Sequence, residues 1–250
     1  MTSAEKQKIA GFLDLTADYL GSGYKSAEKE YNFDKSHNIE SINKNITIRE
    51  NDTIEKISEE IKACRNCNLG STRKNAAAGE GSLNPLVMVI GEGPGEDEDR
   101  QGRPFVGKAG QLLDKMLSSI ELSRDTNTFI ANIIKCRPPG NRDPYPEEIT
   151  ACAHFLERQI KFLKPKFLLI TGKIAAQTLL KTNDSIGKLR GKVMEIKISG
   201  AVYPLIATYH PAALLRFEDY KRPAWEDLKL LRSRLNLLTD LNENNFPAVS

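Results

Sequence analysis

Four cysteines are the residues whose types and spacing point most directly to chemistry. Cys64 and Cys67 form a C-x2-C pair, and Cys136 and Cys152 follow later in the chain. Four thiolates can hold a tetrahedral zinc ion or a 4Fe–4S cluster. The spacing favours a metal site over four unrelated buried cysteines, but it leaves both metals open. The first residues show no signal-peptide pattern, so we expect a cytoplasmic compartment in which disulfides are rare.

Two polar residues stand where apolar segments end or are interrupted. Asn132 lies inside the apolar run FIANII, and His210 follows the apolar run PLIATY. A buried amide must satisfy its donor and its acceptor, either on neighbouring backbone or on a ligand. Taken alone, Asn132 more often fills the structural role. Of the other histidines, His37 lies in a polar segment and His154 lies close to Cys152, so His210 is the candidate catalytic imidazole.

A glycine-rich segment, GEGPGEDED at 91–99, follows a continuous apolar run. It lacks the Lys-Ser/Thr pair of a phosphate-binding loop, and Glu96 breaks the glycine pattern of dinucleotide-binding loops. The acidic residues that follow would also repel a triphosphate. A nucleotide cofactor is therefore not favoured. The next segment, GRPFVG, carries Phe105 just before a helical pattern, where the ring belongs either to the core or to a binding site.

The elements that must position these residues alternate between strand and helix from Pro85 onward. Apolar runs predict strands at 86–92, 128–135, 166–172, 192–198 and 202–210. Helical spacing predicts helices at 107–120, 146–163, 173–180 and 222–241. The alternation predicts an α/β fold of three layers, α/β/α, around a mostly parallel central sheet. In such folds ligands bind beyond the carboxyl ends of the strands, where Glu92, Asn132 and His210 fall.

The chain divides into three parts by composition. Residues 1–50 form an N-terminal extension with an amphipathic helix at 3–21 and a polar linker, residues 51–242 a catalytic domain, and residues 243–250 a tail. Asp52 or Thr53 is expected to cap a short helix that ends near residue 62. Residues 64–250 carry a net charge of +6, which suits a polyanionic partner, although ordinary surface charge would give the same number. No apolar run is long enough to span a membrane.

The motifs together resemble the family 4 uracil-DNA glycosylases, the thermophile-type iron–sulfur class of that superfamily. The resemblance covers about residues 55–235 and rests on GEGPGEDED, GRPFVGKAG, ANIIKCRPPGNRDP, HPAALLR and the cysteine spacing. It implies the uracil-DNA glycosylase fold and a 4Fe–4S cluster on the four cysteines. It also implies hydrolysis of the N-glycosidic bond of uracil in DNA, which leaves an abasic site and starts base excision repair.

The resemblance assigns roles in a pocket that receives a flipped base. Asn132 would pair with O4 and N3–H of uracil, and Phe105 would stack on the ring. Cytosine presents the opposite donor and acceptor pattern, so Asn132 would reject it. The acidic stretch, with Glu98 as the expected residue, would exclude the methyl group of thymine. Backbone N–H groups around Gly93 would reach O2.

Bond cleavage leaves negative charge on the uracil ring and positive character on the sugar. His210 would donate to O2 and stabilise the leaving anion. Glu92 would steady the sugar cation or orient water. Family 1 enzymes place an Asp where this chain has Gly93, so the water-activating group stays open.

Residues outside the pocket would bind the DNA. Leu214 and Leu215 resemble the wedge that fills the space of the flipped base. Arg137, Arg142 and Arg216 are expected to contact phosphates. The expected partner is uracil-containing DNA, single- or double-stranded, bound by a monomer, and residues 1–50 could dock a protein.

Two other functions compete with this interpretation. A covalent uracil-binding relative carries a basic, His-containing insertion after the Asn strand, and this chain lacks it between Asn132 and Cys136. The second is a non-catalytic, metal-stabilised nucleic-acid-binding or polymerase-associated module. Release of free uracil from DNA distinguishes an enzyme from such a module.

Overall fold

The structure, a computed structural model, describes residues 52–243, and the side chains up to residue 238. The helix expected at 3–21, the polar linker and the tail after residue 243 lie outside the described residues. The three-part division of the chain therefore stays a prediction. Within the described part, no helix combines the length and the apolar character needed to cross a membrane.

A mixed sheet of six strands forms the centre of the protein, in the order β1-β3-β2-β4-β6-β5. The four inner strands run parallel, and the edge strands β1 and β5 pair antiparallel with their neighbours. Every residue of β2, β3 and β4 is buried, which explains their unbroken apolar sequences. The strands are β1 (Glu80–Gly81), β2 (Val87–Gly91), β3 (Thr128–Asn132), β4 (Phe167–Thr171), β5 (Val193–Ile198) and β6 (Ala201–Thr208).

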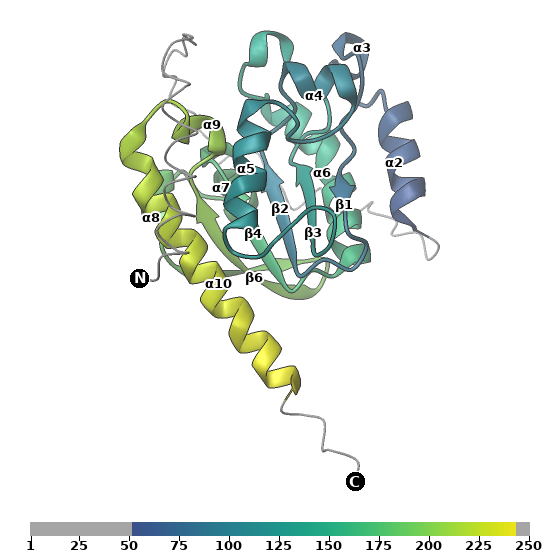
Figure 1. Cartoon of the computed structure of the whole chain (residues 1–250). Coiled ribbons are helices and arrows are strands. Elements are labelled where there is room, and N and C mark those ends of the chain that lie inside the picture. The colour runs from purple at the N-terminus through teal and green to yellow at the C-terminus, as the bar shows by residue number, and fades with distance from the viewer. Residues whose placement is uncertain (1–51, 244–250) are drawn as a thin grey trace.

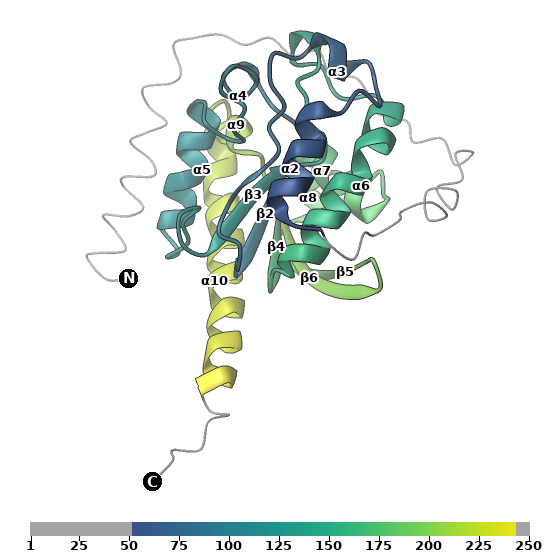
Figure 2. The ribbon, with the colours of Figure 1, turned by 90° about the vertical axis from the view of Figure 1, so that its right-hand side faces the viewer.

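Helices cover both faces of the sheet, so the predicted three-layer α/β/α fold is confirmed (Figure 1). Helices α2, α6, α7 and α8 pack on one face, and α5, α9 and α10 on the other. Figure 2 shows α5 and α10 on one side of the strands and α2 and α6 on the opposite side. The helices are α2 (Ile54–Ala63), α3 (Leu69–Thr72), α4 (Glu96–Gln101), α5 (Lys108–Ser118), α6 (Pro146–Leu163), α7 (Lys173–Leu180), α8 (Ile186–Leu189), α9 (Pro211–Leu214) and α10 (Lys221–Glu243), with short 3-10 turns at Pro139–Asn141 and Glu218–Tyr220.

Local signals set several helix boundaries. The Thr53 hydroxyl accepts the backbone N–H of Lys56 and caps α2, so Thr53 rather than Asp52 is the N-cap. Pro146 opens α6 because proline is pre-organised for the first turn. The acidic run 96–99, which carried no helix prediction, forms the first turn of α4, where negative charge is favourable. Gly102 ends α4 in a left-handed conformation, with φ of 71°.

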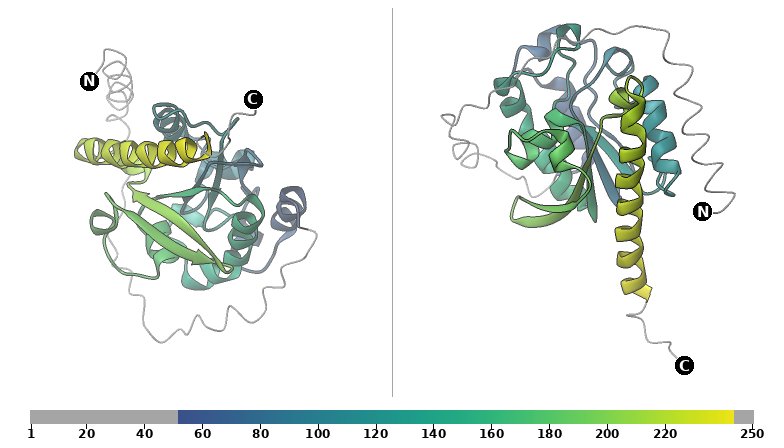
Figure 3. Two further views of the ribbon diagram at one scale, coloured as in Figure 1. Left: turned by 90° about the horizontal axis from the view of Figure 1, so that it is seen from below. Right: turned by 90° about the vertical axis from the view of Figure 1, so that its left-hand side faces the viewer.

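The sheet brings the candidate residues to one edge. Gly91 at the end of β2 pairs with Asn132 at the end of β3, and His210 follows β6. Helix α10 crosses the face of the sheet opposite to α2, as the view from below in Figure 3 shows. Asn132 and His210 therefore lie at the carboxyl ends of the parallel strands, as the sequence analysis predicted.

Candidate active site

The side chain of Asn132 is a buried amide. Its side chain is 1% exposed, and neither Nδ2 nor Oδ1 has a hydrogen-bond partner among the described residues. Leaving a buried donor or acceptor unpaired costs about 1–3 kcal/mol, so such groups are rare in native structures. The Asn132 amide does not bond to neighbouring backbone, which was the alternative to binding a ligand. An amide with both functions unused indicates a ligand that supplies one acceptor and one donor.

Gly91 makes room for this amide. A Cβ atom at residue 91 would lie 2.5 Å from Asn132 Oδ1 and 2.5 Å from Phe105 Cζ. Both distances are far below ordinary contact, so only glycine allows the amide and the ring to approach the end of β2 together. Residue 91 must therefore be glycine, since the side chains of Asn132 and Phe105 leave no space for a Cβ atom.

The ring of Phe105 lies beside the Asn132 amide at the end of β2. Its ring stacks on the ring of His210, with centroids 5.4 Å apart and planes inclined by 29°. Its backbone is left-handed, with φ of 51°, which is uncommon for a bulky residue and requires support from the surroundings. The structure thus brings together Asn132, Phe105 and His210 from three distant segments of the chain.

His210 is held as a neutral imidazole. Its Nδ1 accepts the backbone N–H of Ala212 at 3.2 Å, so the ring proton belongs on Nε2, which is then a donor. Burial lowers the pKa of His210 to about 4, and the positive charge of Arg216 adds to this effect. At neutral pH the ring therefore carries no charge and presents one N–H.

Glu92 and Gly93 follow Gly91 at the strand end and are partly buried. Burial raises the pKa of Glu92 to about 7, with a smaller contribution from the negative charge of Asp143. A carboxyl group with such a pKa exchanges protons near neutral pH, which suits a general base. A Cβ at Gly93 would lie 2.7 Å from Ile134 Cγ1, so the backbone there packs closely.

Glu98 joins two loops of the site. Its Oε1 accepts the backbone N–H groups of Val106 and Gly107, each at 2.8 Å, and its Oε2 accepts that of Gly95 at 3.1 Å. The carboxylate therefore holds the glycine-rich segment against the segment that carries Phe105. Its expected role in excluding a methyl group stays a prediction.

The residues expected to contact DNA have partners within the chain. Leu214 and Leu215 are 1% and 8% exposed and pack in the core beneath α5 and α10, so their wedge role stays a prediction. Arg142 forms two hydrogen bonds to Glu148, at 2.6 and 2.9 Å.

Two further arginines were expected on phosphates. Arg137 donates to Asn141 at 2.7 Å and lies 3.5 Å from the carboxylate of Glu96. Arg216 is exposed and follows α9 directly after Leu215. Their contacts with phosphates likewise stay predictions.

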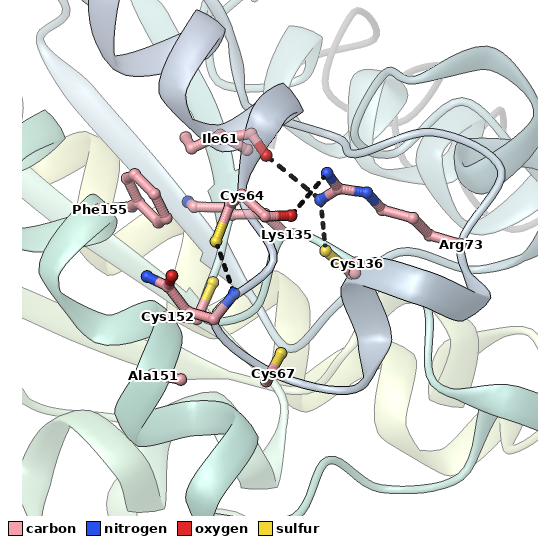
Figure 4. A pocket seen from close by; sticks show the side chains of 11 residues that line it. Ile61, Cys64, Cys67, Arg73, Lys135, Cys136, Ala151, Cys152 and Phe155 are labelled. Carbon is pink, nitrogen blue, oxygen red and sulfur yellow. Dashed lines mark hydrogen bonds between the residues drawn. The ribbon is translucent and has the colours of Figure 1, made fainter.

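The four cysteines line a single cavity, seen from close by in Figure 4. Cys64 and Cys67 come from the segment after α2, Cys136 from the segment after β3, and Cys152 from α6. The space is about 290 Å³, part of it open to solvent. Within residues 52–243, no three His, Cys, Asp or Glu side chains converge closely enough to hold a single metal ion. The four sulfurs thus border one common space, although they come from three separate segments of the chain.

Arg73 binds at this cavity and was missed by the sequence analysis. It donates to Cys136 Sγ at 2.8 Å, to the carbonyl of Ile61 at 3.2 Å and to that of Cys64 at 3.1 Å. It therefore ties the end of α2 to the cysteine after β3 (Figure 4). A C-x2-C pair followed closely by an arginine was the available signal.

Lys135 was also missed, although it supports Asn132. Its buried ammonium group donates to the backbone carbonyl of Asn132 at 2.8 Å and to Gln159 Oε1 at 2.7 Å. The backbone of Asn132 is thereby fixed while its side-chain amide stays unpaired. The signal in the sequence was a lysine at the end of an apolar run.

Known proteins resemble the chain over most of its length. The sequence model of the Uracil DNA glycosylase superfamily matches residues 78–229. The Type-4 uracil-DNA glycosylase of Sulfurisphaera tokodaii is 43% identical over 186 residues, which cover 72% of this chain and 84% of that protein. That of Saccharolobus solfataricus is 41% identical over 190 residues, 74% of this chain and 88% of that protein. That of Pyrobaculum aerophilum is 45% identical over 181 residues, 71% of this chain and 92% of that protein.

Proposed function

Since the chain belongs to the uracil-DNA glycosylase superfamily and is an enzyme that excises uracil from DNA in repair, we propose that Asn132, Phe105 and His210 form its base pocket. The observation that carries this proposal is the buried amide of Asn132, whose donor and acceptor have no partner in the part of the chain that the structure describes. A flipped uracil supplies the missing partners, and its ring has Phe105 to stack on.

The pairing explains the choice of base. Asn132 Nδ2 donates to uracil O4, and Asn132 Oδ1 accepts uracil N3–H. Cytosine offers an amino donor and an unprotonated ring nitrogen at these positions, so both contacts fail. A buried pocket that leaves polar groups unpaired with the wrong base discriminates strongly against it.

The chemistry follows from the neighbouring groups. The bond between uracil N1 and the sugar C1′ breaks, and its electron pair stays on the uracil ring, where negative charge reaches O2. His210 Nε2–H donates to O2 without transferring its proton, which fits a neutral imidazole. Water adds to C1′ and gives its proton to the Glu92 carboxylate, which also faces the positive charge on the sugar.

Release of free uracil tests this function. Excess protein is incubated with an oligonucleotide that contains one uracil and with a matched one that contains cytosine. Free uracil and an abasic site are expected from the first substrate alone. Tight binding of DNA without any release of uracil would instead support the non-catalytic module.

The pKa of Glu92 predicts a pH dependence of the rate. A carboxyl group with a pKa of about 7 is mostly protonated at lower pH and cannot accept a proton from water. The single-turnover rate of uracil release should therefore rise as the pH increases through about 7 and then level off. Because the pKa of His210 is about 4, this residue stays neutral over the same range.

Glu92→Gln should lower the rate and remove the rise between about pH 6 and 8, since glutamine cannot ionise. Glu96→Gln, which neutralises an exposed carboxylate in the same segment, is the control and should keep the rise. If the rise persists in Glu92→Gln, another group accepts the proton.

We further propose that Cys64, Cys67, Cys136 and Cys152 hold a 4Fe–4S cluster. The support is the common cavity, its four sulfurs and the similarity to type-4 enzymes. The cluster would act as a cross-link between α2, the segment after β3 and α6. Arg73 would donate a hydrogen bond to the Cys136 thiolate.

Purified protein should therefore contain about four irons and four sulfides per chain. Cys64→Ala or Cys152→Ala should lose both the visible absorption and several degrees of melting temperature, because the cross-link disappears. Metal analysis, absorption spectra and thermal unfolding measure these effects. Stoichiometric zinc without iron, in protein prepared anaerobically from iron-replete cells, would contradict the proposal.

The partner of the site is DNA, in keeping with the superfamily. We propose that Arg137, Arg142 and Arg216 bind phosphates, with the first two leaving their partners Asn141 and Glu148 as DNA arrives. We also propose that the protein is cytoplasmic and monomeric and that it acts on single- or double-stranded DNA. Residues 1–50 would dock a protein partner.

A further inference from the structure

The segment that carries Phe105 needs external support. It runs from Gly102 at the end of α4 to Gly107 before α5, and Phe105 adopts a left-handed backbone within it. An ordinary side chain reaches this conformation only when its surroundings hold it there. The position of the aromatic wall therefore depends on whatever fixes the neighbouring peptide groups.

Arg124 supplies one half of this support. It lies in the turn between α5 and β3, and its side chain is 11% exposed. Its Nη1 donates to the carbonyl of Pro104 at 3.1 Å, and its Nη2 donates to the carbonyl of Phe105 at 2.8 Å. The guanidinium group thus binds the peptide groups on both sides of the Phe105 Cα atom.

Glu98 supplies the other half. Its carboxylate accepts the backbone N–H groups of Val106 and Gly107, which come directly after Phe105. The peptide group between Phe105 and Val106 is therefore bound at both ends, its carbonyl by the positive charge of Arg124 and its N–H by the negative charge of Glu98. Helix α5 closes the remaining side, since a Cβ at Gly110 would lie 1.9 Å from the Phe105 carbonyl oxygen.

Arg124 is itself fixed by two carboxylates. Its Nε and Nη2 donate to Asp114 at 2.9 and 2.8 Å, and its Nη1 also pairs with Glu80 of β1. Burial raises the pKa of Glu80, but hydrogen bonds from Arg103 and Arg124 bring it below its ordinary value, so the group stays ionised. Only a planar fork with several N–H donors can serve two carbonyls and two carboxylates at once.

We propose that Arg124 is a positioning residue for uracil excision, which acts by holding Phe105 against the base. The proposal rests on the proposed role of Phe105 as the stacking wall. Within the described residues, Arg124 forms no hydrogen bond with Asn132 or His210, so its influence on the reaction passes through the Phe105 backbone. A shift of the wall by a fraction of the ring thickness would misplace the uracil relative to His210.

The experiment is a double-mutant cycle on the single-turnover rate of uracil release. Arg124→Lys keeps the charge but loses the fork, and should lower the rate by about 10-fold or more. Phe105→Ala should lower the rate by itself. In the Phe105→Ala background, Arg124→Lys should cost less than about 2-fold, because the wall that it positions is gone.

Arg103→Gln is the matched control. Arg103 shares Glu80 with Arg124, is exposed, and has no hydrogen bond to the carbonyls of Pro104 or Phe105. Its replacement should leave the rate within about 2-fold of the unchanged enzyme. A milder variant, Asp114→Asn, weakens the anchor of Arg124 and keeps the carbonyl contacts, so a small loss that again depends on Phe105 is expected even if Arg124→Lys fails to fold.

Equal losses in both backgrounds would overturn the proposal, since Arg124 would then act independently of Phe105. An unchanged rate in both Arg124→Lys and Asp114→Asn would do the same. A different outcome marks failure of the pocket itself: if Phe105→Ala excises uracil as fast as the unchanged enzyme, the stacking role of Phe105 is wrong. The cycle therefore separates an error about Arg124 from an error about the pocket.

Discussion

Replacing His210 with alanine is expected to lower the single-turnover rate of uracil release by about 10²-fold or more, with only a modest loss of substrate binding. The reason is the timing of the charge. Uracil O2 becomes strongly negative only as the glycosidic bond breaks, so a donor at O2 stabilises the transition state more than the bound substrate. The bond from Ala212 to Nδ1 keeps the Nε2 proton available for this contact.

The rate and the affinity must be measured separately for this test. Rates come from excess enzyme on a single-uracil duplex, and affinities from binding to a duplex with a non-cleavable uracil analogue. His154→Gln is the control, because His154 lies on α6 against Phe155 and takes no part in the pocket. A near-normal rate in His210→Ala would contradict the assigned role.

Replacing Asn132 with aspartate should have an equally large effect of a different kind. An ionised aspartate repels uracil O4, and a protonated one presents an O–H and a carbonyl that match the cytosine edge. Uracil excision should fall by about 10²-fold or more, and weak excision of cytosine should appear. The unpaired amide in the structure is the basis, since no described residue competes for these contacts.

Matched duplexes that differ only in uracil or cytosine measure this change. Asn132→Leu is the companion variant, with a similar size and no polar atoms. It should lose uracil excision without gaining cytosine excision. It should also melt no lower than the unchanged protein, because two unpaired buried groups disappear. If Asn132→Leu still prefers uracil, the amide does not select the base.

The sequence predicted the sheet well where burial is complete on both faces. Strands β2 and β4 are continuous apolar runs, and α6 and α7 occupy the ranges that were expected. The run at 128–135 was predicted to form a strand along its whole length, but β3 ends at Asn132. Ile133 and Ile134 remain buried beyond the strand, so their apolar character reflects core packing and not strand length.

The chemical residues could be located from the sequence, whereas their supports could not. Asn132 stands out as a polar residue inside an apolar run and His210 as one that follows an apolar run, and the family resemblance implied their roles. Arg124 reaches Phe105 across a helix and a turn, and Glu98 binds backbone amides that carry no side-chain signal. Such contacts depend on how distant segments fold together, and neither spacing nor periodicity reveals them.

A crystal structure of the protein with DNA that contains the abasic product and free uracil would test the central claim most directly. The base is expected in the pocket, with its O4 and N3–H on the Asn132 amide, its ring against Phe105 and its O2 at His210 Nε2. All four contacts should lie within ordinary hydrogen-bond or stacking distance. Uracil bound elsewhere, or an Asn132 amide bonded to the protein instead of the base, would contradict the account.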